Sequence, residues 1–272
     1  MIDFFSNLNP VIQALLATLF TYGITALGAG LVFFFKKVSI TVMDAMLGFA
    51  AGVMIAASFW SLLNPAIEMA DSLGMVSWLV VFIGFFSGGV LLYISDKLFN
   101  YFDKKLASKT NIEETNNNSF KRCLMLIFSI TMHNIPEGLA VGVAFGSIVY
   151  GLDGATLMSA CLLALGIGLQ NFPEGTAVSV PLRREGMSRK KAFLFGQLSG
   201  MVEPIAGVIG ALLVVKVRYL LPFMLSFAAG AMIYVVVQEL IPESQTNENK
   251  SLMAIFTLIG FSIMMILDVA LS

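Results

Sequence analysis

The sequence predicts an all-α membrane protein with eight transmembrane helices, folded as a single transmembrane domain over residues 1–272. The chain is 58% hydrophobic and 12% charged, with a mean hydropathy of +0.88, whereas a soluble domain carries roughly a quarter charged residues. Its formal net charge is −1, so no polybasic surface indicates a nucleic-acid partner. The cysteines form no CxxC pair, which argues against a zinc ribbon.

Eight segments are apolar over the length of about 20 residues that a bilayer-spanning helix requires. The stretch MIDFFSNLNP before the first segment lacks the basic region and the cleavage site of a signal peptide, so we expect the first span to stay in the protein. The expected spans are residues 10–35, 42–68, 75–99, 121–149, 155–182, 190–215, 217–241 and 251–271.

The distribution of basic residues predicts that both termini are extracytoplasmic. With eight spans, all of the 16 Lys and Arg residues except Lys216 and Arg218 fall on one side of the membrane. Loops rich in Lys and Arg stay in the cytoplasm, and a seven-span or nine-span arrangement would break this asymmetry. Residues 100–120 form one such loop, and the Asn-rich stretch KTNIEETNNNS within it predicts that it is a disordered cytoplasmic loop.

Two nearly identical polar phrases interrupt the fourth and fifth spans: HNIPEG at residues 133–138 and QNFPEG at residues 170–175. On an α-helix the glutamate of each phrase falls between the two leading polar side chains, on one face. Consecutive spans are antiparallel, so if these faces meet, Glu137 and Glu174 stand in the middle. The neutral side chains then flank the glutamates in two pairs, which are His133 with Gln170 and Asn134 with Asn171.

This arrangement predicts two adjacent cation sites inside the membrane. A carboxylate at the bilayer centre costs about 2.5–3.5 kcal/mol, and two facing carboxylates also repel each other, so they are either protonated or neutralised by a cation. Imidazole, carboxylate and amide ligands suit divalent ions such as Zn²⁺, Fe²⁺ or Mn²⁺. The alternative is that the same groups serve only as hydrogen bonds between helices.

Prolines predict broken helices at the depth of the polar phrases. Pro136, Pro173 and Pro204 have no N–H, so each frees the carbonyl four residues earlier. Freed backbone is tolerated in a membrane only where it is buried in protein or lines a cavity. Broken helices and a motif repeated on antiparallel neighbours are typical of transporters, and they favour an inverted repeat around the fourth and fifth helices.

HNIPEG and QNFPEG resemble the paired signatures of the ZIP family of metal transporters, in particular its bacterial branch, and the resemblance extends over all eight helices. It implies uptake of divalent transition-metal ions, chiefly zinc and also iron, manganese or cadmium, across the cell membrane into the cytoplasm. It further implies a binuclear metal site between the fourth and fifth helices, alternating access by movement of one helix group against another, and a homodimer.

The resemblance also implies two sets of metal ligands that share both glutamates. The sets are His133, Glu137, Gln170 and Glu174 for one ion, and Asn134, Glu137, Asn171, Glu174 and Glu203 for the other. The sequence departs from the family at Gln170, where many relatives have histidine, and His133 is the only histidine of the chain. The histidine-rich cytoplasmic loop of many relatives is also absent.

Other polar residues predict the two ends of a path through the membrane. Ser58, Ser61, Asn64 and Glu68 follow the second span at helical spacing and are expected at an outer entrance. Gln238 and Glu239 resemble an exit site of the family, although side chains at a helix end also reach water in this way. Near other span ends, Asp96 and Asp268 are expected to be hydrated. Away from the metal face, Gly138, Gly142 and Gly146 indicate close helix packing.

Two other functions remain open at this point: an intramembrane metalloenzyme, and a proton-linked transporter of another substrate. A metalloenzyme needs an open metal position, a water and a general base, but the sequence contains no HExxH motif. We therefore expect no enzymatic activity and no cofactor, with divalent ions as the cargo and membrane lipid as the surroundings. Cation binding that requires both Glu137 and Glu174 would exclude a pure proton carrier.

Overall fold

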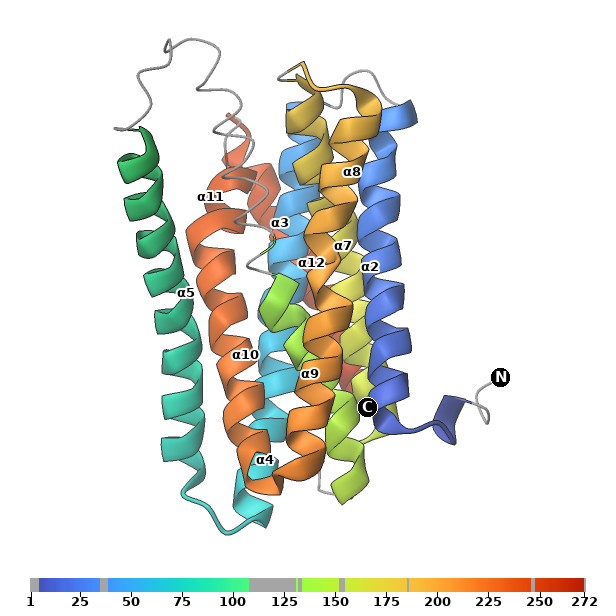
Figure 1. Ribbon diagram of the computed structural model, residues 1–272, viewed down its shortest axis with the longest axis vertical. Helices are drawn as coiled ribbons and strands as arrows, with labels where there is room; N and C mark the ends of the chain where they lie inside the picture. Colours follow the sequence, from blue (N-terminus) through green and yellow to red (C-terminus); the bar gives the residue numbers. More distant parts are fainter. Residues whose placement is uncertain are drawn as a thin grey trace.

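The computed structural model describes residues 5–34, 39–107, 131, 134–151, 155–184, 186–245 and 248–271. Within these ranges every regular element is a helix, which confirms the all-α prediction. The helices lie along one common axis and form an elongated bundle (Figure 1). His133 lies outside the described residues, as do residues 121–130 and 132 of the predicted fourth span, residues 121–149.

The long helices follow the predicted spans closely. They are α2 (Pro10–Phe34), α3 (Ile40–Ala57), α5 (Ser77–Ala107), α7 (Leu157–Arg184), α8 (Arg189–Gly200), α9 (Val202–Lys216), α10 (Leu221–Val235) and α12 (Lys250–Leu271). Shorter elements are the π-helices η1 (Ser58–Leu63) and η4 (Val236–Leu240), the α-helices α4 (Asn64–Ser72) and α11 (Ile241–Ser244), and the 3₁₀ turns η2 (Ile148–Tyr150) and η3 (Arg218–Leu220). Residues 134–147 form a further helix.

Six stretches of the described chain are long and apolar enough to cross a membrane: Pro10–Phe34, Ile40–Ser72, Ser77–Leu98, Arg189–Val215, Leu221–Ser244 and Lys250–Ala270. The helix α7 has 28 residues, which is also enough, but the polar phrase in its middle makes it less apolar. The predicted loop at residues 100–120 begins later than expected, because α5 continues to Ala107. Residues 108–120 lie outside the described residues.

The prolines have different effects on the helices that contain them. Near Pro204 the chain is interrupted as predicted, because α8 ends at Gly200 and α9 begins at Val202. The break predicted at Pro173 is wrong, since α7 runs through this residue without interruption. A proline removes one hydrogen bond of the helix, and here the close packing of α2 against α7 keeps the helical path.

The helices α3 and α10, in the predicted second and seventh spans, share a sequence repeat that leads into the same structural feature. FAAGVMI at residues 49–55 and FAAGAMI at residues 227–233 differ at one position. A π-helix follows each copy, and then a short helix with proline in its first turn. Proline explains the widened turn, because its ring clashes with the carbonyl four residues earlier. The two spans point in opposite directions along the bundle (Figure 1).

Glycines allow the helices around the polar phrases to approach closely. A Cβ on Gly142 would overlap the backbone of Gly207 in α9, and a Cβ on Gly138 would overlap the backbone of Glu203. The predicted packing role of this glycine row is therefore confirmed. On the other side of the site, a Cβ on Gly175 of α7 would overlap the backbone of Thr25 in α2. The two contacts bring α2 and α9 next to the polar phrases.

The described helices fall into two packed groups. One group contains α2, α7, α8 and α9, with the helix at residues 134–147 packed on α9; the other contains α3, α4, α5, α10, α11 and α12. The groups meet mainly where α3 packs against α7. In Figure 1, α5 and α10 stand on one side of the bundle and α2 on the other.

Candidate metal site

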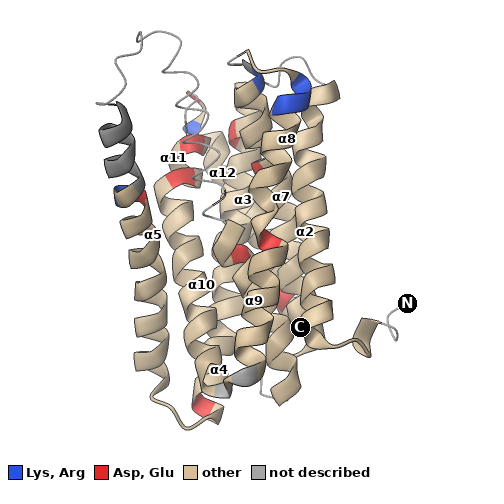
Figure 2. Cartoon of the chain, viewed as in Figure 1, with Lys and Arg blue, Asp and Glu red and all other residues tan. Residues whose placement is uncertain are grey.

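Six of the seven predicted ligands lie in the described part of the chain, and all six are buried. Their side chains are 0% exposed, except that of Glu174, which is 4% exposed. Figure 2 shows acidic segments part-way along the bundle, away from the basic residues at the end where α8 begins. The six residues are Asn134 and Glu137 from the helix at residues 134–147, Gln170, Asn171 and Glu174 from α7, and Glu203 from α9.

The two polar phrases face each other, as their spacing predicts. The amide nitrogen Nε2 of Gln170 donates a hydrogen bond to Oε1 of Glu137 across 2.6 Å. The carboxylate of Glu137 is also close enough to those of Glu174 and Glu203 for the three to repel one another. Buried carboxylates that repel one another require protons or a cation to offset their charge.

The three amide side chains share one orientation, with the nitrogen bonded to protein and the oxygen unpaired. Gln170 donates to Glu137, Asn171 donates to both oxygens of Glu203 at 2.9 and 3.0 Å, and Asn134 donates to the carbonyl of Ser199 at 2.8 Å. The oxygens of all three amides are buried without a hydrogen-bond partner. Each amide thus presents an acceptor, which is the group that a cation binds.

The glutamates of the two phrases add two more unpaired acceptors to the cluster. Oε2 of Glu137 and Oε2 of Glu174 are buried without a hydrogen-bond partner. A buried polar group without a partner costs about 1–3 kcal/mol, so a cluster of such oxygens calls for a common partner. Among the described residues, only Gln13 and Asp268 have another side-chain oxygen of this kind.

The described part of the site is built from carboxylate and amide oxygens. Across the described ranges, no three His, Cys, Asp or Glu residues lie close enough together to hold a metal ion on their own. Amides would therefore have to complete the ligand set. His133, the one nitrogen ligand that the sequence predicts, lies outside the described residues, so the described ligands of the first predicted set are Glu137, Gln170 and Glu174.

Comparison with known proteins assigns the chain to a family. The family model described as the ZIP zinc transporter matches residues 104–268. Human zinc transporter ZIP11 is 41% identical to the chain over 97% of the chain and 98% of its own length. The chain belongs to the ZIP family of zinc transporters.

Bacterial ZIP proteins also match this chain over most of its length. Zinc transporter ZIPB of Bordetella bronchiseptica is 34% identical over 92% of the chain and 78% of its own length. Zinc transporter ZupT of Clostridium perfringens is 32% identical over 97% of the chain and 98% of its own length. The ZIP resemblance is confirmed and is not confined to the bacterial branch. The chain is accordingly a multi-pass membrane protein of a transporter family, and not an enzyme.

One residue at the ZIP site was not predicted from the sequence. The hydroxyl of Thr21 in α2 donates a hydrogen bond to Oε2 of Glu203. The available signal was weak: threonines at positions 18, 21 and 25 lie at helical spacing on one face of the first span. No feature of a single sequence states which face of another helix such a row will meet.

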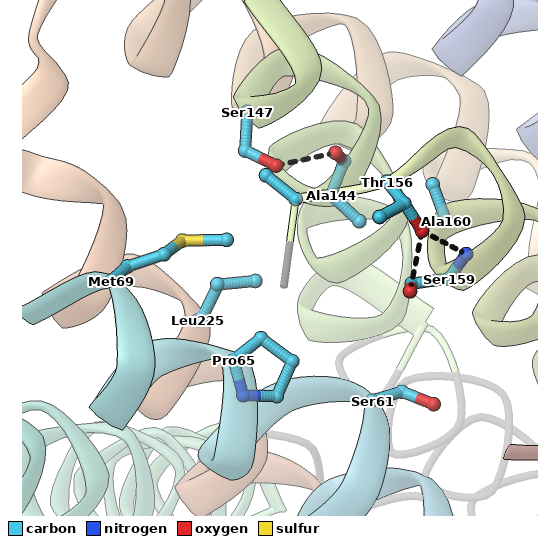
Figure 3. A pocket seen from close by; sticks show the side chains of 10 residues that line it. Ser61, Pro65, Met69, Ala144, Ser147, Thr156, Ser159, Ala160 and Leu225 are labelled. Carbon is cyan, nitrogen blue, oxygen red and sulfur yellow. Dashed lines mark hydrogen bonds between the residues drawn. The ribbon is translucent and has the colours of Figure 1, made fainter. Parts of the chain in front are cut away.

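At the end of the bundle where α4 begins and α7 starts, a small cavity is lined by hydroxyl groups (Figure 3). Ser61, Ser147, Thr156 and Ser159 contribute these groups. The hydroxyl of Ser61 also donates to Oδ1 of Asp268 across 2.7 Å. Asp268 is only 4% exposed, so the expectation that it is hydrated is wrong, and it supplies a buried carboxylate next to the cavity wall.

Of the residues predicted for an entrance, only Ser61 lines this cavity. Ser58 is buried and donates to the carbonyl of Met54 in its own helix. Nδ2 of Asn64 donates to Oε1 of Glu68 across 2.8 Å, near the surface. The entrance role of Ser58, Asn64 and Glu68 therefore stays a prediction.

The two residues predicted for an exit both belong to η4 and have different surroundings. Gln238 is exposed, whereas Glu239 is partly buried and close enough to Glu174 for the two carboxylates to repel each other.

On the neighbouring helix α5, Asp96 accepts a hydrogen bond of 2.9 Å from the hydroxyl of Tyr234. Asp96 is therefore bound to α10, which the expectation of simple hydration did not include.

Proposed function

We propose that this chain takes up divalent metal ions across the cell membrane into the cytoplasm, with zinc as the chief cargo and iron, manganese and cadmium as further candidates. Its family and the names of its relatives, which are zinc transporters, support this cargo. The observation that carries the proposal is the cluster of buried, unpaired side-chain oxygens at Asn134, Glu137, Gln170, Asn171 and Glu174. A divalent cation would satisfy these acceptors and offset the charge of the carboxylates together.

Two ions would share the carboxylates of Glu137 and Glu174. His133 and Gln170 would complete one ligand set, and Asn134, Asn171 and Glu203 would complete the other. The unpaired amide oxygens of Gln170 on one side, and of Asn134 and Asn171 on the other, support both halves of this proposal. Imidazole suits zinc and iron better than oxygen ligands do, so His133 would favour these ions.

Alternating access would take place by movement of one helix group against the other. All the described ligands lie in the group that contains α7 and α9, whereas η4 with Glu239 and α12 with Asp268 lie in the other group. Movement between the groups would therefore carry the ions as a unit. The FAAG repeat on two spans of opposite direction supports an inverted repeat in this fold, as in many transporters.

The path would run from the cavity at Ser61 to the end of the bundle where α8 begins. Arg189, Lys190 and Lys191 mark that end (Figure 2), and basic residues favour the cytoplasmic side. Both termini would then be extracytoplasmic in an eight-span topology. Asp268 would attract cations near the entrance, and Glu239 would receive them from Glu174 on the way to the cytoplasm.

The outer surface of the bundle suits membrane lipid and a second copy of the chain. The helices α5 and α12 expose large apolar side chains along their length, among them Trp78, Phe82, Phe86, Ile255 and Ile266. A homodimer in the bilayer is therefore part of the proposal, as the family resemblance implies.

Radiolabelled zinc uptake into proteoliposomes tests the proposed function. We expect uptake that saturates with zinc and falls when cadmium, manganese or ferrous iron competes, because these ions would bind the same oxygens. Measurements across pH, with and without a proton gradient, separate metal transport from proton-linked transport of another substrate. Uptake no greater than in protein-free vesicles under all of these conditions would contradict the proposal.

A further inference from the structure

Glu203 differs from the other two carboxylates of the site because both of its oxygens have hydrogen-bond partners. Oε2 accepts from the hydroxyl of Thr21 at 2.5 Å, and Nδ2 of Asn171 donates to both oxygens. Glu137 and Glu174, in contrast, each keep one unpaired oxygen. Glu203 is thus held by two neutral donors, the hydroxyl of Thr21 and the amide of Asn171.

The hydroxyl of Thr21 has one proton and two acceptors within reach. The carbonyl of Thr18 lies at 3.0 Å, and Oε2 of Glu203 lies at 2.5 Å. A hydrogen bond to a carboxylate is about twice as strong as one between neutral groups. We therefore infer that the hydroxyl of Thr21 donates to Glu203 and not to the carbonyl of Thr18. The hydroxyl of Thr25, in contrast, donates to the carbonyl of Thr21 at 3.3 Å.

The backbone around these threonines is fixed by close helix contacts. A Cβ on Gly28 would overlap the backbone of Phe172, next to Asn171, and a Cβ on Gly175 would overlap the backbone of Thr25. Gly200, at the end of α8, lies against the side chain of Thr25. The backbone that carries the Thr21 hydroxyl therefore has little freedom to move away from Glu203.

We propose that Thr21 is a positioning residue of the metal site. Its hydroxyl holds the carboxylate of Glu203, and Glu203 in turn binds the amide nitrogen of Asn171, so that the oxygen of Asn171 is left to face the ion. The first span thereby acts on the site without contributing a ligand. This inference rests on the proposed function, because it assumes that cations bind at the site.

The chain of hydrogen bonds leads to only one of the two ligand sets. Asn171 and Glu203 belong to the set with Asn134, whereas Gln170 is held by Glu137. Loss of the Thr21 hydroxyl should therefore weaken the binding of one ion and leave that of the other nearly unchanged. A general loosening of the bundle would weaken both.

Titration calorimetry of cadmium and of zinc into the purified full-length protein in detergent tests the inference. We expect Thr21→Val to weaken one of the two binding events by about tenfold or more, since loss of a group that orients a ligand typically costs 10–100-fold in metal affinity. Thr21→Ser keeps a hydroxyl and should retain the wild-type affinity at both sites.

Thr18→Val is the matched control on the same face of α2. Thr18 is also fully buried, but its hydroxyl donates to the carbonyls of Ala14 and Leu15. The Thr18→Val variant should lower the melting temperature in detergent as much as Thr21→Val does, without changing the affinity for metal.

The inference is overturned if Thr21→Val binds metal like the wild type, if Thr21→Ser is as weak as Thr21→Val, or if Thr18→Val is equally weak. Absence of stoichiometric binding by the wild type is a different result, because it would contradict the proposed function itself. A wild type with two events and a Thr21→Val variant with one event weakened supports both.

Discussion

Zinc uptake is expected to fall to the level of protein-free vesicles when Glu137 is replaced by glutamine. The carboxylate would serve both ions, and glutamine has similar size but no charge to offset that of the metal. Removing one partner of a buried charge pair costs about 3–5 kcal/mol, which corresponds to a loss of about a hundredfold or more in affinity. Glu174→Gln should have the same effect for the same reason. Initial rates of radiolabelled zinc uptake into proteoliposomes measure both.

Glu248→Gln is the matched control for these variants. Glu248 is exposed in the segment before α12, and the same change of charge there should leave uptake near the wild-type rate. Equal amounts of folded protein in the vesicles must be confirmed by size-exclusion chromatography before reconstitution. Near-normal flux in either Glu137→Gln or Glu174→Gln would count decisively against carboxylates shared by two ions.

The second large effect is expected at the contact between α2 and α7. A Cβ on Gly28 would overlap the carbonyl of Phe172, so Gly28→Ala should force the two helices apart. Overpacking of this kind typically costs about 1–3 kcal/mol, and it would also shift Thr21 relative to Glu203. We expect a lower melting temperature in detergent together with slower zinc uptake.

Gly30 provides the control, because it lies on the same helix and a Cβ added there would have no atom within 4 Å. Gly30→Ala should be neutral or stabilise the helix by up to about 1 kcal/mol, since alanine has the higher helix propensity. If both variants melt at the same temperature and transport zinc equally well, the close approach of α2 and α7 does not determine stability or the site.

Apolar length and repeated polar phrases made much of this structure predictable. Segments of sufficient length gave helices close to their observed bounds, and the spacing within the two polar phrases placed Glu137 and Gln170 on the faces that a hydrogen bond now joins. These features depend on local periodicity, which one sequence contains. The break before Pro204 was also predictable, because proline has no N–H and leaves the carbonyl of Gly200 without its helical partner.

Contacts between distant helices account for what the sequence did not reveal. Pro173 was expected to break its helix, but packing through Gly28 and Gly175 keeps α7 continuous. Asp268 was expected to be hydrated because it lies near a span end, yet Ser61 of another span covers it. In each case the deciding partner is far away in the chain, and its position depends on the tertiary arrangement.

The FAAG repeat is different, because it is present in the sequence but contains no polar side chain that would mark it. Both copies consist of small and apolar residues, which resemble the composition of any membrane span. Only the shared succession of π-helix and proline marks them as equivalent. Comparison of whole spans, in addition to polar motifs, would have revealed this second sign of internal symmetry.

Anomalous diffraction from crystals of the full chain soaked in zinc tests the central claim most directly. The account predicts anomalous density between Glu137 and Glu174, with oxygens of both carboxylates at about 2.0–2.2 Å from a zinc ion. Zinc bound elsewhere, with no anomalous density between these two carboxylates at a concentration that saturates transport, would contradict it.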